Sequence, residues 1–209
     1  RASKGAIQKV KIGPKTFDVQ YETIMKVAAA GICGSGYIDI ITELLRAGII
    51  DRSGKINGSL KHKRIRDGEY GKEFVIAFKE EVGTTGDIVI NEMDMENLKR
   101  AKGAIYAASA MLVRHMGLSF DNLEQVFIAG GFGTSVDMAN AIAIGLLPDL
   151  PREKFSFVGN SSLIGAREII LSHDALFDAD AIARQLTYFE LSVEPNYMDE
   201  YVASLFFPH

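Results

Sequence analysis

Apolar and polar residues alternate at the start of the chain, on both sides of a glycine-proline turn. The alternation covers residues 6–12 and residues 17–21. It predicts a hairpin of two strands, and hence an antiparallel start to the sheet. Small apolar residues then lead into a glycine-rich turn at residues 31–36 and a periodic apolar stretch that ends at Gly48. That order predicts a strand, a glycine turn and a helix.

The segment at about residues 49–90 has a different pattern. It is rich in glycine and charge and has one apolar run, at residues 74–78. We interpret it as a loop-rich insertion with short strands. Beyond it, Asp94 is the predicted N-cap of a long amphipathic helix that reaches Met116. Gly117 follows where a helix end favours a left-handed residue.

Two further strand-turn-helix units follow. The first has a strand at residues 125–129 and a helix at residues 137–147, stopped by a proline. The second has a strand at residues 155–158 and a helix that reaches Ser172. The remainder is predicted to be helix with a short tail.

Strands that alternate with helices through short glycine turns predict an α/β fold. We expect a mixed sheet with an antiparallel start and parallel strands flanked by helices. A chain of 209 residues is long enough for one such domain, so residues 1–209 are assigned to a single domain.

The composition narrows the functional classes. A net charge of −4 gives no electrostatic footprint for nucleic acid or an anionic membrane. The one basic cluster, residues 61–66, is interpreted as a solvated loop, with a docking patch as the alternative. There is neither a membrane-spanning apolar stretch nor an apolar signal region. Cys33 is the single cysteine, which fits a reducing compartment, so we expect a soluble, cytoplasmic protein.

Several classes of catalytic and cofactor site are excluded by motif. The glycine turns lack the third glycine of a dinucleotide fingerprint, and there is no P-loop. The glycine-serine-glycine stretch after Cys33 lacks a thiol-protease nucleophile, and no nucleophile-elbow motif occurs. The four histidines show no metal-ligand spacing, and one cysteine cannot hold an iron-sulfur cluster. We therefore predict no catalytic residue and no metal site, and Cys33 is expected to be a small packed residue, with a redox role as the alternative.

The glycine turns themselves suit a phosphate or nucleoside ligand. A turn between a strand and a helix lets backbone N–H groups approach a ligand, and the helix N-terminus favours anions. Each turn alone could equally be a tight connection, but three of them together favour a ligand.

Two sequence segments resemble those of a known superfamily. The segment 126–133 is similar to the adenosine motif of actin, heat-shock chaperones and sugar kinases, and the segment 100–103 is similar to a chaperone helix that faces adenosine. Further sequence segments resemble the C-terminal region of ATP-dependent reductive activators of corrinoid proteins. Among them are residues 31–36, 145–148 and 159–166. The resemblance covers nearly the whole chain.

The resemblance implies an RNase H-like, actin-like ATPase (ASKHA-type) subdomain and a nucleotide site. Its glycine turn would pass beneath the nucleoside, with two helix residues opposite and a second turn near the pocket mouth. The nucleotide-binding residues so implied are Gly130, Gly131, Phe132, Gly133, Thr134, Lys102, Tyr106, Gly159, Asn160 and Ser161. For Lys102 a solvated helix face, and for Tyr106 a core aromatic, is the alternative.

The resemblance also implies a reaction. Such activators use ATP with Mg²⁺ and an N-terminal iron-sulfur domain to deliver one electron to an inactivated cob(II)alamin. This restores cob(I) in a methyltransferase or O-demethylase system, and the corrinoid belongs to a partner protein.

This sequence departs from the family pattern in one respect. It contains no Asp-x-Gly-Thr phosphate-binding hairpin, and it begins at Arg1. We interpret it as a C-terminal subdomain truncated at its N-terminus, inactive alone and binding no cofactor tightly. Its expected partners are the corrinoid protein, the upstream portion of the same protein and, through a sheet edge near residues 6–21, a second copy.

Two other functions remain open from the sequence. One is a small-molecule kinase of the same superfamily, whose substrate aspartate would lie elsewhere. The other is a non-catalytic module that docks a corrinoid protein and uses its pocket only structurally.

Overall fold

The computed structural model describes residues 2–130 and 135–208. The predicted hairpin is present: β1 (Ala6–Ile12) pairs antiparallel with β2 (Val19–Thr23). The next strand, β3 (Gly31–Ile32), is only two residues long and pairs parallel with the start of β1. Helix α1 (Gly34–Arg46) then packs across β1, and its buried face joins the hairpin in the main hydrophobic core.

The second edge of β1 is closed from within the chain. Beyond the short pairing with β3, the backbone N–H of Val10 donates to Asp39 Oδ2 at 3.3 Å, and that of Ile12 donates to Glu43 Oε2 at 3.0 Å. Both carboxylates belong to α1 and are buried. The sequence led us to expect an open edge near residues 6–21. On this side of β1 the donors already have acceptors, and β2 is the strand at the opposite margin of the sheet.

The segment predicted to be a loop-rich insertion carries an antiparallel sheet. Its strands are β4 (Ile65–Gly68), β5 (Gly71–Ala77) and β6 (Ile88–Asn91), and α2 (Lys79–Val82) is a single turn between the last two. Phe74 of β5 is fully buried in the same core as β1 and α1. The sheet is thus an integral part of the packed body.

The basic cluster at residues 61–66 is not uniformly solvated. Lys61 and Lys63 are exposed, whereas Arg64 is only 7% exposed. Its guanidinium donates to the carbonyls of Val75 and Ile76 and lies over the ring of Phe78. Arg64 therefore anchors this segment to the end of β5.

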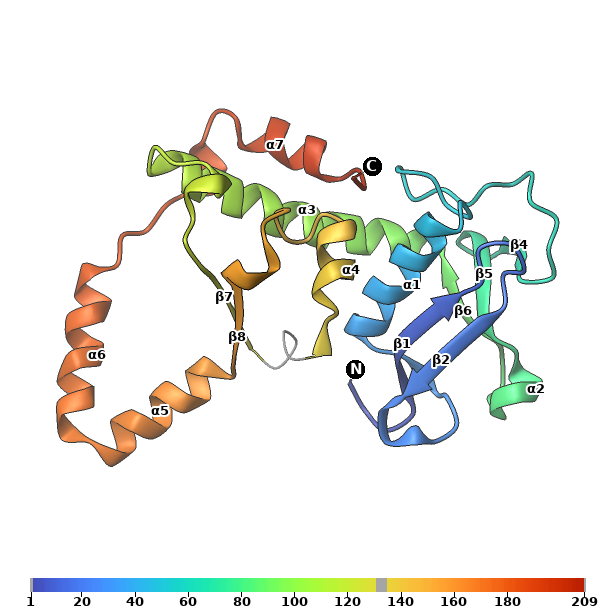
Figure 1. The fold of residues 1–209 in the computed structure, drawn as a ribbon, viewed down its shortest axis with the longest axis horizontal. Helices are drawn as coiled ribbons and strands as arrows, with labels where there is room; N and C mark the ends of the chain where they lie inside the picture. Colours follow the sequence, from blue (N-terminus) through green and yellow to red (C-terminus); the bar gives the residue numbers. More distant parts are fainter. Residues whose placement is uncertain (1, 131–134, 209) are drawn as a thin grey trace.

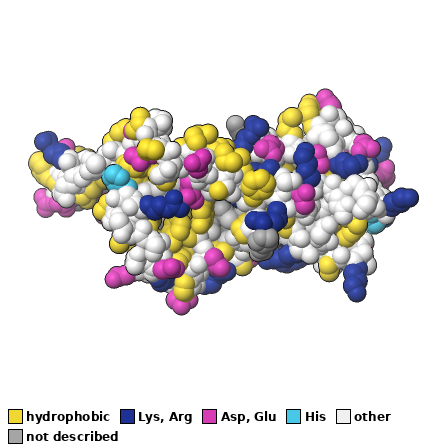
Figure 2. All heavy atoms as spheres, turned by 90° about the horizontal axis from the view of Figure 1, so that it is seen from above, with side chains coloured by type: hydrophobic (Ala, Val, Ile, Leu, Met, Phe, Trp, Pro, Cys, Tyr) yellow, Lys and Arg dark blue, Asp and Glu magenta, His cyan; other side chains and the backbone are white. Residues whose placement is uncertain are grey.

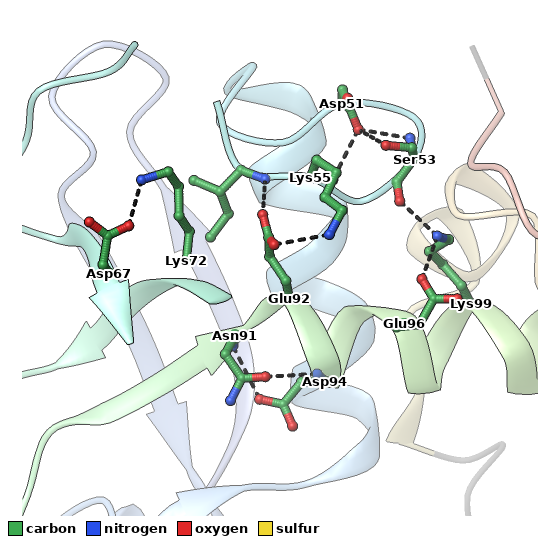
Figure 3. Close-up of polar contacts among 11 residues, drawn as sticks. Asp51, Ser53, Lys55, Asp67, Lys72, Asn91, Glu92, Asp94, Glu96 and Lys99 are labelled. Carbon is green, nitrogen blue, oxygen red and sulfur yellow. Dashed lines mark hydrogen bonds and ion pairs between the residues drawn. The ribbon is translucent and has the colours of Figure 1, made fainter. Parts of the chain in front are cut away.

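The long helix α3 (Glu92–His115) begins two residues earlier than its predicted cap. Asn91 is the N-cap: its side chain accepts from the N–H of Asp94, and the Asp94 carboxylate accepts from the N–H of Asn91, forming a capping box (Figure 3). The prediction that Asp94 is the cap was wrong, because Asp94 occupies the third helical position. Gly117 has a φ of 71°, the left-handed conformation predicted for this helix end.

The C-terminal half contains the two predicted strand-turn-helix units. Strands β7 (Val126–Ala129) and β8 (Phe155–Gly159) form a parallel pair. Helix α4 (Met138–Ala143) is shorter than predicted, because the chain turns at Gly145, whose φ is 73°, before the proline is reached. Helix α5 (Ser161–Leu171) ends one residue before its predicted boundary.

Two more helices complete the chain: α6 (His173–Gln185) and α7 (Tyr197–Ser204). Short 3₁₀ turns occur at Ile24–Lys26, Phe120–Asn122, Arg152–Lys154 and Leu191–Val193.

Helix α3 connects the two ends of the molecule (Figure 1). Strands β1–β6 and α1 lie at one end, β7, β8, α5 and α6 lie at the other, and α7 packs along α3. The α/β class is confirmed, but the strands of the described residues form three separate sheets rather than one. Within residues 2–130 and 135–208, no helix is both long and apolar enough to span a bilayer.

The end of the molecule that carries α5 and α6 is unusually apolar on its surface. Neither helix has a buried residue. Their exposed large hydrophobic side chains are Leu163, Ile164, Ile169, Ile170, Leu171, Leu176, Phe177 and Ile182. Hydrophobic side chains, in yellow, reach the surface over the left and central parts of Figure 2. We call α5, α6 and the exposed side of β7 the apolar end.

Candidate functional site

A cavity of about 1080 Å³ lies where α3 crosses α1 and α4. Lys102 and Tyr106, two residues of the predicted site, line it from α3, and Thr42 lines it from α1. The C-terminal residues Phe206 and Pro208 close another side. A cavity of this size is large enough for a nucleotide-sized ligand.

Lys102 is not on a solvated helix face. It is 1% exposed, and its ammonium donates to the main-chain carbonyl of Phe206 at 2.5 Å. Nζ also lies 5.3 Å from the centre of the Phe207 ring. Burial, together with the nearby positive charge of Lys99, lowers the pKa of Lys102 from 10.5 to about 8. Among the described residues no carboxylate pairs with Lys102, and a buried ammonium in that situation favours a further hydrogen-bond acceptor.

Tyr106 lies one turn farther along α3. It is partly buried, and its ring is 5.5 Å from that of Phe120. Burial raises the pKa of its phenol, and the charge of Glu200 raises it further, with Arg114 acting in the opposite direction. Tyr106 therefore packs on an aromatic residue and also faces the cavity, and its contact with a nucleoside stays a prediction.

The first glycine turn lies at the end of β7. Gly130 has a φ of 100°, which favours glycine, and its N–H donates to the carbonyl of Gly159 at 2.6 Å. Gly131, Phe132, Gly133 and Thr134 lie outside the described residues. Among the described residues, the ends of β7 and β8 therefore lie next to one another at Gly130 and Gly159.

The second turn begins a helix. Gly159 has a φ of 67°, and a Cβ at that position would meet nothing within 4 Å. Asn160 is the N-cap of α5, because its side chain accepts from the N–H of Leu163 at 3.1 Å, and Ser161 is the first helical residue. This helix N-terminus has the local geometry that favours an anion or a polar group.

The predicted residues thus fall into two groups. Lys102 and Tyr106 share the cavity beneath α3, whereas Gly130 and Gly159 meet at the ends of β7 and β8. The cavity lining does not include the described residues of the glycine turns.

The sequence did not identify a buried polar cluster that positions α4. Asp39 Oδ1 accepts from the Asn140 side chain at 2.7 Å, and the Asn140 carbonyl accepts from the Thr42 hydroxyl at 3.3 Å. Burial raises the pKa of Asp39, and the hydrogen bonds from Asn140 and Val10 partly oppose this. The cluster therefore ties α1 to α4, the helix that follows β7 along the chain.

Asp39 and Asn140 also line a second cavity, of about 630 Å³, between β1, β2 and the start of α4. They occur 101 positions apart with no shared motif. The one sequence signal for this cluster is on α1, where the acidic Asp39 lies among apolar residues on the buried face of the helix.

Acidic, cysteine and histidine side chains do not gather into a metal site in the described residues. Within residues 2–130 and 135–208, no three of them lie close enough to hold an ion. Cys33 is buried, and its thiol donates to the Ile7 carbonyl at 3.2 Å, as expected for a small packed residue.

Comparison with known proteins gives a family model and a solved structure that each match the whole chain. A family model described as the C-terminal domain of RACo, the ASKHA domain, matches residues 1–209. A solved structure described as a reductive activator for corrinoid, iron-sulfur protein has a TM-score of 0.94 and 49% sequence identity. The match covers 100% of this chain and 33% of that one.

Two curated proteins are also similar. Corrinoid activation enzyme RamQ of Eubacterium limosum is 33% identical over 214 residues, which is 99% of this chain and 36% of that protein. A [Co(II) methylated amine-specific corrinoid protein] reductase of Methanosarcina barkeri is 31% identical over 160 residues, 76% of this chain and 25% of that protein. The chain therefore spans about a third or less of the length of these relatives.

Proposed function

The chain belongs to the family of C-terminal ASKHA domains of RACo, and from this premise we propose that it is the nucleotide-binding part of an ATP-dependent reductive activator of corrinoid proteins. The longer protein would return cob(II)alamin of a corrinoid protein to cob(I) in a methyltransferase or O-demethylase system. The observation that carries the proposal is the similarity, over the whole chain and at 49% identity, to a reductive activator for a corrinoid, iron-sulfur protein. A fold alone would not carry it, since one fold supports many functions.

The physical role of ATP in such a reaction is to bias a conformational equilibrium. Reduction of cob(II) at low potential is unfavourable, so it has to be coupled to a favourable step. A nucleotide that binds one domain arrangement better than another can supply the bias, by no more than the difference between its two binding free energies. In this proposal the glycine turns, Lys102 and Tyr106 bind the nucleoside.

The cofactors divide between this chain and the rest of the longer protein. We propose ATP with Mg²⁺ as the ligand of the complete site. Since the described residues contain no cluster of metal-ligating side chains, no residue of this chain is assigned to Mg²⁺ or to an iron-sulfur cluster. The corrinoid cobalt is the substrate and belongs to the partner protein. We also propose that the longer protein acts in the cytoplasm.

The apolar end is the surface where we expect this chain to contact the rest of the longer protein. Phe127 of β7 is 63% exposed, and β7 pairs only with β8 among the described residues. A parallel sheet is normally covered on both faces, and a two-stranded sheet is marginal alone. We propose that another part of the longer protein covers this end and extends the sheet from β7. Pairing of two copies, if it occurs, is expected at this edge rather than at β1.

The decisive experiment uses the longer protein that contains this chain. The corrinoid protein is prepared in the cob(II) state and mixed with the activator and a one-electron reductant, and cob(I) is followed by its visible absorption. We expect cob(I) to form with ATP and not without it. Equal formation in both samples would refute an ATP-dependent activator.

A variant tests the glycine turn. Gly131→Val is expected to abolish the ATP-dependent step and leave folding intact, because a β-branched side chain would fill the space where backbone meets ligand. Gly131 lies outside the described residues, so this expectation rests on the motif. Gly86→Val is the matched control, because a Cβ at Gly86 meets nothing within 4 Å. A normally folded Gly131→Val protein with unchanged ATP affinity would show that the turn does not contact nucleotide.

A further inference from the structure

Near the C-terminal end of the chain, Ser204 and Phe207 are buried, whereas Phe206 and Pro208 are exposed. We call residues 204–208 the C-terminal strap. Phe207 is fully buried in the main core. Its N–H donates to the Arg52 carbonyl at 3.0 Å, and its own carbonyl accepts from Arg52 Nε at 2.8 Å. The loop that carries Arg52 is held to α3, where Lys99 donates to the Ser53 carbonyl (Figure 3).

Two glycines provide room for the strap. A Cβ at Gly103 on α3 would lie 3.2 Å from the Ser204 carbonyl oxygen, and a Cβ at Gly145 would lie 3.0 Å from Cγ of Pro208. Both distances are tighter than ordinary van der Waals contact. The sequence is thus adapted at two distant positions to the close approach of the strap.

The strap also orients the buried lysine of the candidate site. The Phe206 carbonyl accepts from Lys102 Nζ, and the Phe207 ring lies beneath the ammonium. An ammonium has three donors. In the described part of the chain, Phe206 provides the only acceptor for Lys102, and no carboxylate lies within ion-pair distance. Two N–H donors therefore remain for a ligand in the cavity that Lys102, Phe206 and Pro208 line together.

We propose that the C-terminal strap is a positioning element of the nucleotide site: it holds Lys102 at the cavity wall, so that strap docking and nucleotide binding stabilise each other. This proposal rests on the proposed function. A ligand oxygen that accepts from Lys102 supplies the missing partner of a buried cation, and a docked strap removes the cost of orienting that cation. The coupling is reciprocal, so each event strengthens the other by the same factor.

The Phe207 amide is the natural reporter, because its hydrogen bond to Arg52 exists only when the strap is docked. Hydrogen exchange of this amide is measured in the longer protein with and without ADP, and ADP affinity is measured by calorimetry. We expect ADP to slow the exchange several-fold in the wild type. Lys102→Met is expected to weaken ADP binding about tenfold and to abolish the effect on Phe207, since a hydrogen bond from a charged donor is lost.

Lys9→Met is the control. Lys9 is an exposed lysine on β1 that pairs with Glu22 and does not line the cavity of Lys102. It is expected to keep both the ADP affinity and the response of Phe207. If ADP binds and the exchange of Phe207 stays the same or becomes faster, the strap proposal is wrong while nucleotide binding stands. If the wild-type protein does not bind ADP, the proposed function and the strap proposal both fail.

Discussion

Replacing Lys102 with methionine is expected to change how the stability of the chain depends on pH. The folded state lowers the pKa of Lys102 from 10.5 to about 8. Between these two values the unfolded chain binds more protons than the folded chain, so the free energy of unfolding rises as pH increases through this window. Each pKa unit corresponds to about 1.4 kcal/mol, so the full effect is about 3 kcal/mol.

About half of that effect, roughly 1.5 kcal/mol, falls between pH 8 and pH 9.5. Urea unfolding of the 209-residue chain, followed by far-ultraviolet circular dichroism, measures it. As pH rises, we expect the free energy of unfolding of the wild type to increase by this amount relative to that of Lys102→Met. Lys9→Met, at an exposed position on β1, is the control and should show no shift. Parallel pH profiles for wild type and Lys102→Met would refute the idea that a charged Lys102 is costly in the folded state.

Four further outcomes are expected. Asp39→Ala should lower the free energy of unfolding by about 3 kcal/mol in thermal or urea melts, because it leaves the Val10 N–H and the Asn140 side chain without their buried acceptor; loss below about 1 kcal/mol would contradict this. Asn160→Ala should cost about 1 kcal/mol and speed hydrogen exchange in the first turn of α5, because the helix loses its cap. Phe177→Glu should reduce any concentration-dependent association of the isolated chain in sedimentation, since Phe177 is 60% exposed on the apolar end. The isolated chain should release no phosphate from ATP above background in a coupled assay, and steady release that survives repurification would show that a complete site is present.

Local patterns predicted the elements well where the sequence carries explicit signals. The hairpin at residues 6–21 follows from alternation around a turn, and the end of α3 follows from Gly117. Helix α4 was predicted too long because Pro148 is the more conspicuous stop signal, whereas the left-handed Gly145 ends the helical run first. The division of the strands among three sheets could not be predicted, since pairing is decided by contacts between distant segments.

The burial of Lys102 did have a signal in the sequence. The buried positions of α3 are Met95, Lys99, Lys102, Gly103, Ala107, Ala110 and Met111. They follow the three- and four-residue spacing of one helix face. From the sequence, Lys102 was interpreted as a ligand-facing or solvent-facing residue, and Lys99 was not singled out. The positions of both lysines on the helix predict that they are buried. Their hydrogen-bond acceptors could not be predicted, because the Ser53 carbonyl lies 46 residues from Lys99 and the Phe206 carbonyl lies 104 residues from Lys102 in the sequence.

The closed edge of β1 depends on a match between two periodicities. Asp39 and Glu43 are four residues apart on α1, a rise of about 6 Å. Val10 and Ile12 are two residues apart on β1, about 6.7 Å, and their N–H groups point to the same edge. A pair of carboxylates one helical turn apart can therefore accept from successive outward N–H groups of a strand, as carbonyls of a neighbouring strand would. A further strand could pair with this part of β1 only by displacing two buried carboxylates. At β7 the described residues place no such acceptors, so the sheet is far easier to extend from that edge.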